Sequence, residues 1–83
     1  MKGLHAQMFR RVRIRKVRAG QGDGFPEGTE REGWEKEAPQ VGRRYCIYQD
    51  NGKVYRTSVV RRVTHRGFLT SHSAYVLEVL DQG

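Results

Sequence analysis

The sequence has only one cysteine, Cys46, relatively few acidic residues and no long hydrophobic run. A single cysteine cannot form an internal disulfide, which excludes a disulfide-stapled secreted scaffold and makes a reducing cytoplasm the expected compartment. No stretch approaches the roughly 20 apolar residues of a membrane helix. Residues 1–20 lack the apolar core of a secretory signal. The composition therefore predicts a cytoplasmic protein that has no membrane partner.

The chain has 83 residues, of which 36% are hydrophobic, so the core that it can bury is small. This length predicts one domain over residues 1–83, without a large catalytic cleft between packed layers. Residues 1–7 precede the first patterned stretch and are a candidate for disorder.

Positive charge is in excess but unevenly placed, with 16 Lys and Arg against 9 Asp and Glu and a net charge of +7. Residues 1–18 carry seven basic groups and no acid, whereas residues 19–40 carry six acids and two basic groups. Two arrangements follow. Either the acidic segment folds back and partly neutralises the first strand, or the basic face stays separate and meets a polyanion.

Two segments show the pattern of β-strands most clearly. Val12 and Ile14 alternate with arginines, which predicts a strand over residues 8–18. Asn51-Gly52 separates residues 43–49 from residues 53–60 and is a strong hairpin signal. If these two residues form a type I′ turn, Tyr48 pairs with Tyr55.

The remaining chain reads as one long loop and several short strands. Residues 19–41 hold five glycines, two prolines and most of the acids, which predicts a long loop in which 30–37 forms a short helical turn. Strand patterns recur over residues 59–64, 68–70 and 75–80, and in the last of these Tyr75 and Leu77 are expected to point into the core.

This order of elements predicts an all-β fold of five to six strands with one long loop after the first strand. A small SH3-like barrel has this order, and its closure suits a small core because it removes exposed strand edges. A strongly curved antiparallel sheet is the alternative.

The C-terminal half resembles a group of short bacterial and phage proteins. Thr57-Ser58-Val59-Val60 and the stretch from Thr70 to Leu77 resemble the patterns T-S-P-V-x-x-I and T-x-N-S-x-Y-x-L, with Val59 in place of Pro and His72 in place of Asn. The resemblance covers about a third of the chain. It implies a compact β fold and an origin in a mobile element, and it transfers no catalytic residue.

The residues that carry catalytic or metal chemistry do not form a recognisable set. The soft ligands His5, His65, His72 and Cys46 lack the spacing of zinc sites. Cys46, within a strand, lacks an orienting partner and oxyanion donors. The sequence therefore predicts a protein that is not an enzyme and has no metal or other cofactor.

Nucleic acid, either DNA or RNA, is the partner that the charge favours. Arginines on adjacent strands are predicted to contact phosphates without reading sequence, and the candidates are Arg11, Arg13, Arg15, Arg61, Arg62 and Arg66. The aromatic residues Tyr45, Tyr48, Tyr55 and Phe68 offer stacking faces for bases, but the core needs them equally.

A protein-interaction module is the alternative function. Trp34, in the predicted acidic loop, is the natural anchor for a host protein, because tryptophan is enriched at the energetic centres of interfaces. The edges of the short strands also allow a homodimer that forms by strand exchange.

Overall fold

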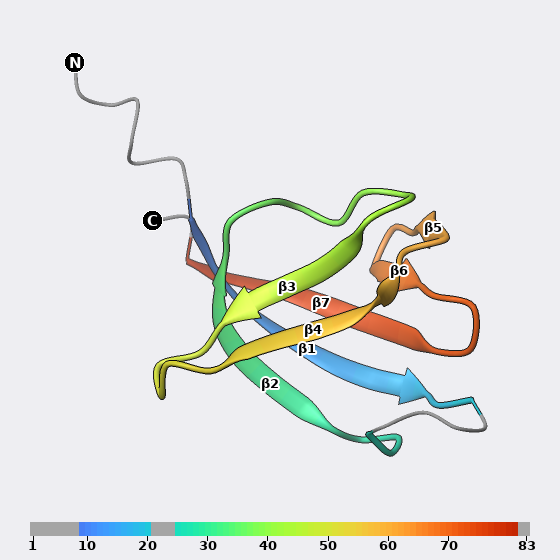
Figure 1. Cartoon of the computed structure of the whole chain (residues 1–83), viewed down its shortest axis with the longest axis horizontal. Coiled ribbons are helices and arrows are strands. Elements are labelled where there is room, and N and C mark those ends of the chain that lie inside the picture. Colours follow the sequence, from blue (N-terminus) through green and yellow to red (C-terminus); the bar gives the residue numbers. More distant parts are fainter. Residues whose placement is uncertain (1–8, 21–24, 82–83) are drawn as a thin grey trace.

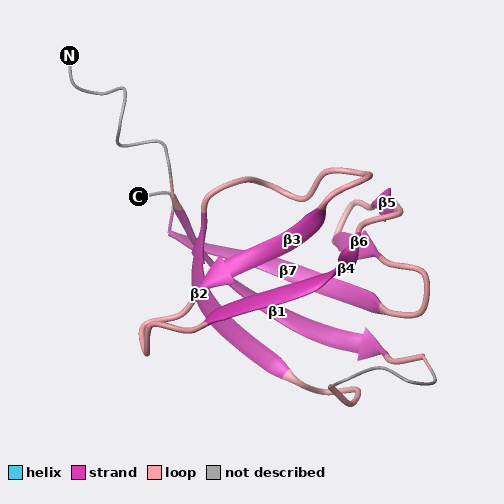
Figure 2. Cartoon of the chain, in the orientation of Figure 1, coloured by secondary structure: helices cyan, strands magenta, loops and turns pink. Residues whose placement is uncertain are grey.

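The structure is a computed structural model that describes residues 9–20 and 25–81, so the predicted disordered segment 1–7 lies outside the described residues. The described residues form strands and loops without a helix (Figure 2), which confirms the all-β class. The seven strands are β1 (Arg10–Arg18), β2 (Glu30–Glu35), β3 (Arg44–Tyr48), β4 (Val54–Val59), β5 (Arg62–Val63), β6 (Gly67–Leu69) and β7 (Ala74–Asp81).

The strands form one antiparallel sheet in the order β4-β3-β2-β1-β7-β6-β5. Its two edge strands, β4 and β5, are consecutive in the chain. The Val60 amide donates to the Arg43 carbonyl at 2.8 Å, and the next amide, that of Arg61, donates to the Leu69 carbonyl at 2.7 Å. The chain thus passes from one edge of the sheet to the other within two residues, which bends the sheet strongly without closing it. The SH3-like assignment stays a prediction.

The core lies between two layers, because β3 and β4 cross over β1 and β7 (Figure 1). Alternation on β1 buries Val12 and Ile14, as predicted. The Phe68 ring lies between Tyr45 and Tyr75, with ring centroids 4.9 and 4.8 Å apart. The buried cluster consists of Val12, Ile14, Tyr45, Ile47, Tyr55, Val60, Phe68 and Tyr75. Leu77 packs against this cluster, in agreement with the predicted inward face of the last strand.

Strand β2 corrects the prediction of a helical turn over residues 30–37 and shortens the predicted loop 19–41. It pairs with β1 through Arg13 opposite Glu32 and Arg15 opposite Glu30. Opposite charges on facing strands favour this pairing over a local helical turn. Gly33 supports it as well, because a Cβ there would lie 2.6 Å from the Tyr48 carbonyl oxygen of β3. This extra strand raises the predicted five or six strands to seven.

The β3–β4 hairpin forms where predicted, but its register differs by one residue. Tyr48 pairs with Val54, and Ile47 pairs with Tyr55. Only Gly52 in this turn has a positive φ, of 86°, so Asn51 does not adopt the left-handed conformation that a two-residue type I′ turn requires. The Gln49 amide donates to the Lys53 carbonyl at 2.9 Å, which makes a three-residue loop.

Two charged side chains are buried among the strands, and the sequence patterns did not reveal either. Lys16 is 2% exposed, and its Nζ donates to the Phe25 carbonyl at 2.9 Å. Glu35 is also 2% exposed and accepts hydrogen bonds from the Tyr45 hydroxyl and the Arg10 guanidinium. Each follows the period-2 alternation of its strand, Lys16 after Ile14 and Glu35 after Gly33, which is the one signal of their inward direction.

Candidate nucleic-acid interface

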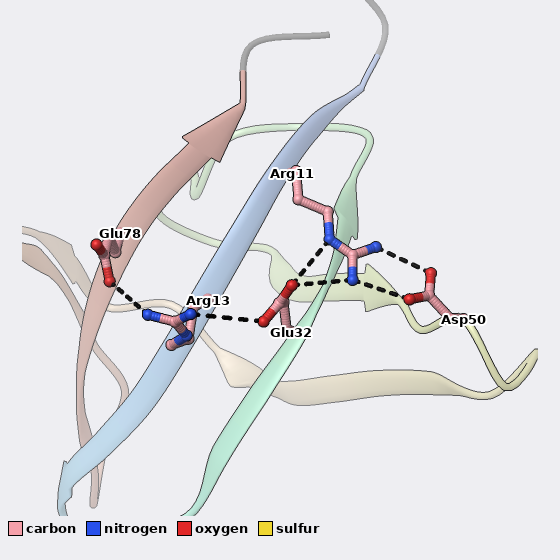
Figure 3. Close-up of polar contacts among 5 residues, drawn as sticks. All are labelled: Arg11, Arg13, Glu32, Asp50 and Glu78. Carbon is pink, nitrogen blue, oxygen red and sulfur yellow. Dashed lines mark hydrogen bonds and ion pairs between the residues drawn. The ribbon is translucent and has the colours of Figure 1, made fainter.

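The outer face of β1 carries an ion-pair network that joins this strand to β2, to β7 and to the turn between β3 and β4 (Figure 3). The Arg11 guanidinium donates to both carboxylate oxygens of Asp50 at 2.9 Å and to Glu32 at 3.0 and 3.2 Å. Arg13 donates to Glu78 at 3.0 Å and lies 3.6 Å from Glu32. Two of the six arginines predicted to contact phosphates are therefore paired with the chain's own carboxylates. Glu32 belongs to the acidic segment 19–40, so this segment partly neutralises the first strand.

The Arg11–Asp50 pair predicts a specific acid response. Hydrogen bonds from Arg11 lower the pKa of the Asp50 carboxyl below its ordinary value of 3.8. A lowered pKa in the folded state stabilises the fold above the ordinary value, and this stabilisation is lost as the pH falls further. The urea midpoint of Asp50→Asn should lie below that of the wild type at pH 6, and the difference should shrink as the pH falls below 3.8. A difference that stays constant across this range would contradict the prediction.

The other four predicted arginines lie at two places. Arg15 is exposed on β1, opposite Glu30 and Val76. Arg61, between β4 and β5, Arg62, on β5, and Arg66, in the β5–β6 turn, are all exposed. The β5–β6 hairpin lies on the side of the molecule away from the β3–β4 hairpin tip, which carries Asp50 (Figure 1). The Arg61 guanidinium donates to the Ser71 hydroxyl at 3.0 Å. The structure therefore separates the six residues into a β1 group and a β5–β6 group.

The β5–β6 group continues into further cations that sequence reasoning did not select as site residues. Arg56 on β4 lies opposite Cys46 of β3 in the strand register. Cys46 and Arg44 are on the same outward face of β3. The Val60 amide donates to the carbonyl of Arg43, at the end of the β2–β3 loop, and Arg61 follows Val60 in the chain. We call this set the basic band, and it consists of Lys36, Arg43, Arg44, Arg56, Arg61, Arg62 and Arg66. The chain has no acidic residue between Asp50 and Glu78, which is the sequence signal that could have located much of it.

Carboxylates are scarce around the basic band. Glu37 is the one acidic side chain within ion-pair distance of a band cation among residues 9–20 and 25–81, and it lies 3.4 Å from Arg43. Both of these side chains are about 60% exposed (63% and 59%), so water screens the pair. The other six band cations keep their positive charge available to a polyanion.

A groove crosses the outer face of β3 within the band. It has a volume of about 430 Å³ and lies between the β2–β3 loop and the strand. Lys36, Arg43 and Arg44 line it together with Cys46 and Tyr48. The lining also includes Glu37 and Tyr45, so the groove combines three cations with one carboxylate, a thiol and two tyrosines.

Tyr48 is the one predicted stacking residue that faces outward. Tyr45, Tyr55 and Phe68 belong to the core, whereas Tyr48 is 42% exposed. Trp34 is its partner across β2 and β3. Trp34 therefore lies in a strand and not in a loop, contrary to the sequence prediction, and the Arg11 guanidinium lies 5.3 Å from the centre of its ring. Its role in binding a protein partner stays a prediction.

Histidine, cysteine and acidic side chains do not cluster in the part of the chain that the structure describes. No group of three or more His, Cys, Asp and Glu side chains is placed to hold a metal ion within residues 9–20 and 25–81. The same residues include no helix with the length and apolarity to cross a lipid bilayer. Cys46 is a free, partly buried thiol.

Comparison with known proteins gives no match: no family model, curated protein or solved structure matches this chain.

Proposed function

We propose that this protein is a non-enzymatic nucleic-acid-binding protein that contacts phosphates through the basic band. The observation that carries the proposal is the separation of charge. Arg11 and Arg13 on β1 are held by Glu32, Asp50 and Glu78, whereas six of the seven band cations have no carboxylate of the described residues within 4 Å. A nucleic-acid backbone is the polyanion whose regular phosphate spacing suits such an extended row of cations.

The guanidinium group suits this role because its fork of N–H donors matches phosphate oxygens. Five of the six unpaired band cations are arginines, and they lie on consecutive strands and not at one point. Such contacts position the nucleic acid and carry no sequence information. Binding should therefore be electrostatic and nearly independent of sequence.

Salt dependence is the first test. Six phosphate contacts correspond to a log–log slope of affinity against salt of about −5 for duplex DNA and about −4 for a single strand. The measurement is fluorescence anisotropy of labelled oligonucleotides between about 50 and 200 mM salt. An absence of binding to any oligonucleotide at the lowest salt would remove the proposal.

A matched pair of double variants separates the basic band from the β1 face. Arg56→Gln with Arg62→Gln should weaken binding roughly tenfold or more at about 50 mM salt and reduce the magnitude of the slope by about 2. Arg11→Gln with Arg13→Gln removes the same charge from the β1 face, where both guanidinium groups are paired with carboxylates, and should leave the slope unchanged. An equal loss in both double variants would show that net charge alone drives binding and would contradict the assignment to the band.

A further inference from the structure

The groove on β3 brings an exposed aromatic ring next to the basic band. Tyr48 and Arg44 line the groove from the two ends of β3, and Lys36 and Arg43 line it from the start and the end of the β2–β3 loop. Tyr48 is 42% exposed although its neighbours in the chain include the fully buried Ile47. The strand alternation thus places this ring where solvent and a ligand can reach it.

The Tyr48 ring has a face available for stacking. Within the described residues, the Tyr48 ring makes no ring–ring contact and no cation–π contact. By contrast, the Arg11 guanidinium lies over the ring of Trp34. Its register partner Val54 is also exposed, at 43%. Tyr48 and Val54 thus place an exposed aromatic and an exposed apolar side chain in one row, and the adjoining groove is lined by Lys36, Arg43 and Arg44 together with Glu37.

We infer that the ligand of this surface is single-stranded nucleic acid, with an unpaired base stacked on Tyr48 and adjacent phosphates held by Arg44 and Arg56. This inference depends on the proposed function and names the form of nucleic acid. Bases in a duplex stack on each other and present only their edges, so an outward ring on a sheet face has no base plane to meet. A single strand offers base planes and phosphates together, which matches a ring beside cations.

The charge pattern fits this occupant better than a protein segment. A band of seven cations with one exposed carboxylate favours acidic over basic partners, and phosphates provide regularly spaced negative charge. Arg44 and Tyr48 are the first and last residues of β3, so they stand at the two ends of the strand's exposed row. A strand of nucleic acid that follows this row meets a cation and a ring in succession.

The test compares a labelled single-stranded thymine oligonucleotide of about 12 residues with a duplex of equal phosphate number by anisotropy. We expect the single strand to bind at least severalfold more tightly at equal salt. Tyr48→Ala should weaken single-strand binding roughly five- to hundredfold and leave duplex binding and the salt slope unchanged. Tyr48→Phe keeps the ring and should bind as the wild type does. The urea midpoints of both variants, at an exposed position, establish that they are folded.

The outcomes distinguish the two proposals. Equal affinity for both oligonucleotides, together with no effect of Tyr48→Ala, would overturn the single-strand inference and leave phosphate binding by the band in place. A lack of binding to either oligonucleotide at low salt would overturn both. Trp34 is the only tryptophan and pairs with Tyr48 across the strands, so its fluorescence gives an independent signal: a base stacked on Tyr48 should change it, and a duplex should not.

Discussion

Replacing Glu35 with alanine is expected to lower the free energy of unfolding by about 2–4 kcal/mol, because it removes a buried carboxylate that accepts hydrogen bonds from a buried hydroxyl and from a partly exposed guanidinium. Glu35 is 2% exposed, and the Tyr45 hydroxyl donates to it at 2.6 Å while the Arg10 guanidinium donates to its other oxygen. Without the carboxylate, the Tyr45 hydroxyl stays buried with no acceptor, and the Arg10 cation loses its partner. A single domain of this size has few kcal/mol to lose.

Tyr45 explains why the loss is large. Burial and the hydrogen bond to Glu35 both raise the pKa of this tyrosine above its ordinary value of 10.0, so the phenol keeps its proton and acts as a donor at every physiological pH. Tyr45→Phe removes the donor together with its need for a partner, and should cost less than Glu35→Ala, about 1–2 kcal/mol.

Urea unfolding followed by circular dichroism measures these differences. If Glu35→Ala does not fold, Glu35→Gln keeps an oxygen acceptor for Tyr45 and should fold with an intermediate loss. Glu37→Ala is the matched control, because Glu37 is exposed and its pair with Arg43 is long, so its midpoint should stay close to that of the wild type. A Glu35→Ala midpoint equal to that of Glu37→Ala would show that the buried carboxylate does not stabilise the fold.

The parts of the fold that the sequence predicted are those in which local pattern and tertiary structure agree. Val12 and Ile14 alternate with arginines in β1 and face the core. Tyr75 also faces the core, from the last strand. Strand β2 could not be predicted because Gly33 and its acidic neighbours have weak strand preference. They form a strand because β1 offers arginines opposite their carboxylates, a relation between segments that no local pattern contains.

The candidate site shows the same limit. The sequence reveals that residues 51–77 lack acids, but it does not reveal where the acids of other segments come to lie. Asp50 reaches Arg11, 39 positions earlier in the chain, because the β3–β4 hairpin tip stands beside β1. Selection of Arg11 and Arg13 from charge alone therefore missed their partners. The neighbours of Tyr48 likewise depend on the hairpin register. The Asn51-Gly52 signal predicted Tyr48 opposite Tyr55, whereas Tyr48 lies opposite Val54.

Replacing Gly67 with alanine is expected to destabilise the protein by about 2–3 kcal/mol through a backbone clash. Gly67 begins β6 and pairs with Val76 of β7. A Cβ at this position would press on the carbonyl oxygen of Tyr75, and would lie 2.8 Å from the carbonyl carbon of Tyr75 and 3.0 Å from the Cα of Val76. These are backbone atoms, which no side-chain rotation can move away.

The clash should spread into the core, because a shift of β7 away from Gly67 would separate Tyr75 from the Phe68 ring, which packs 4.8 Å from it. For a domain of this length, a loss of 2–3 kcal/mol corresponds to a melting temperature lower by roughly 10–20 °C. Gly52→Asn is the control without a clash: Gly52 has a φ of 86° in open space, and asparagine is the side chain that tolerates positive φ best, so its melting temperature should fall by less than that of Gly67→Ala. If Gly67→Ala melted within a few degrees of the wild type, the close approach of β6 to β7 would not constrain the fold.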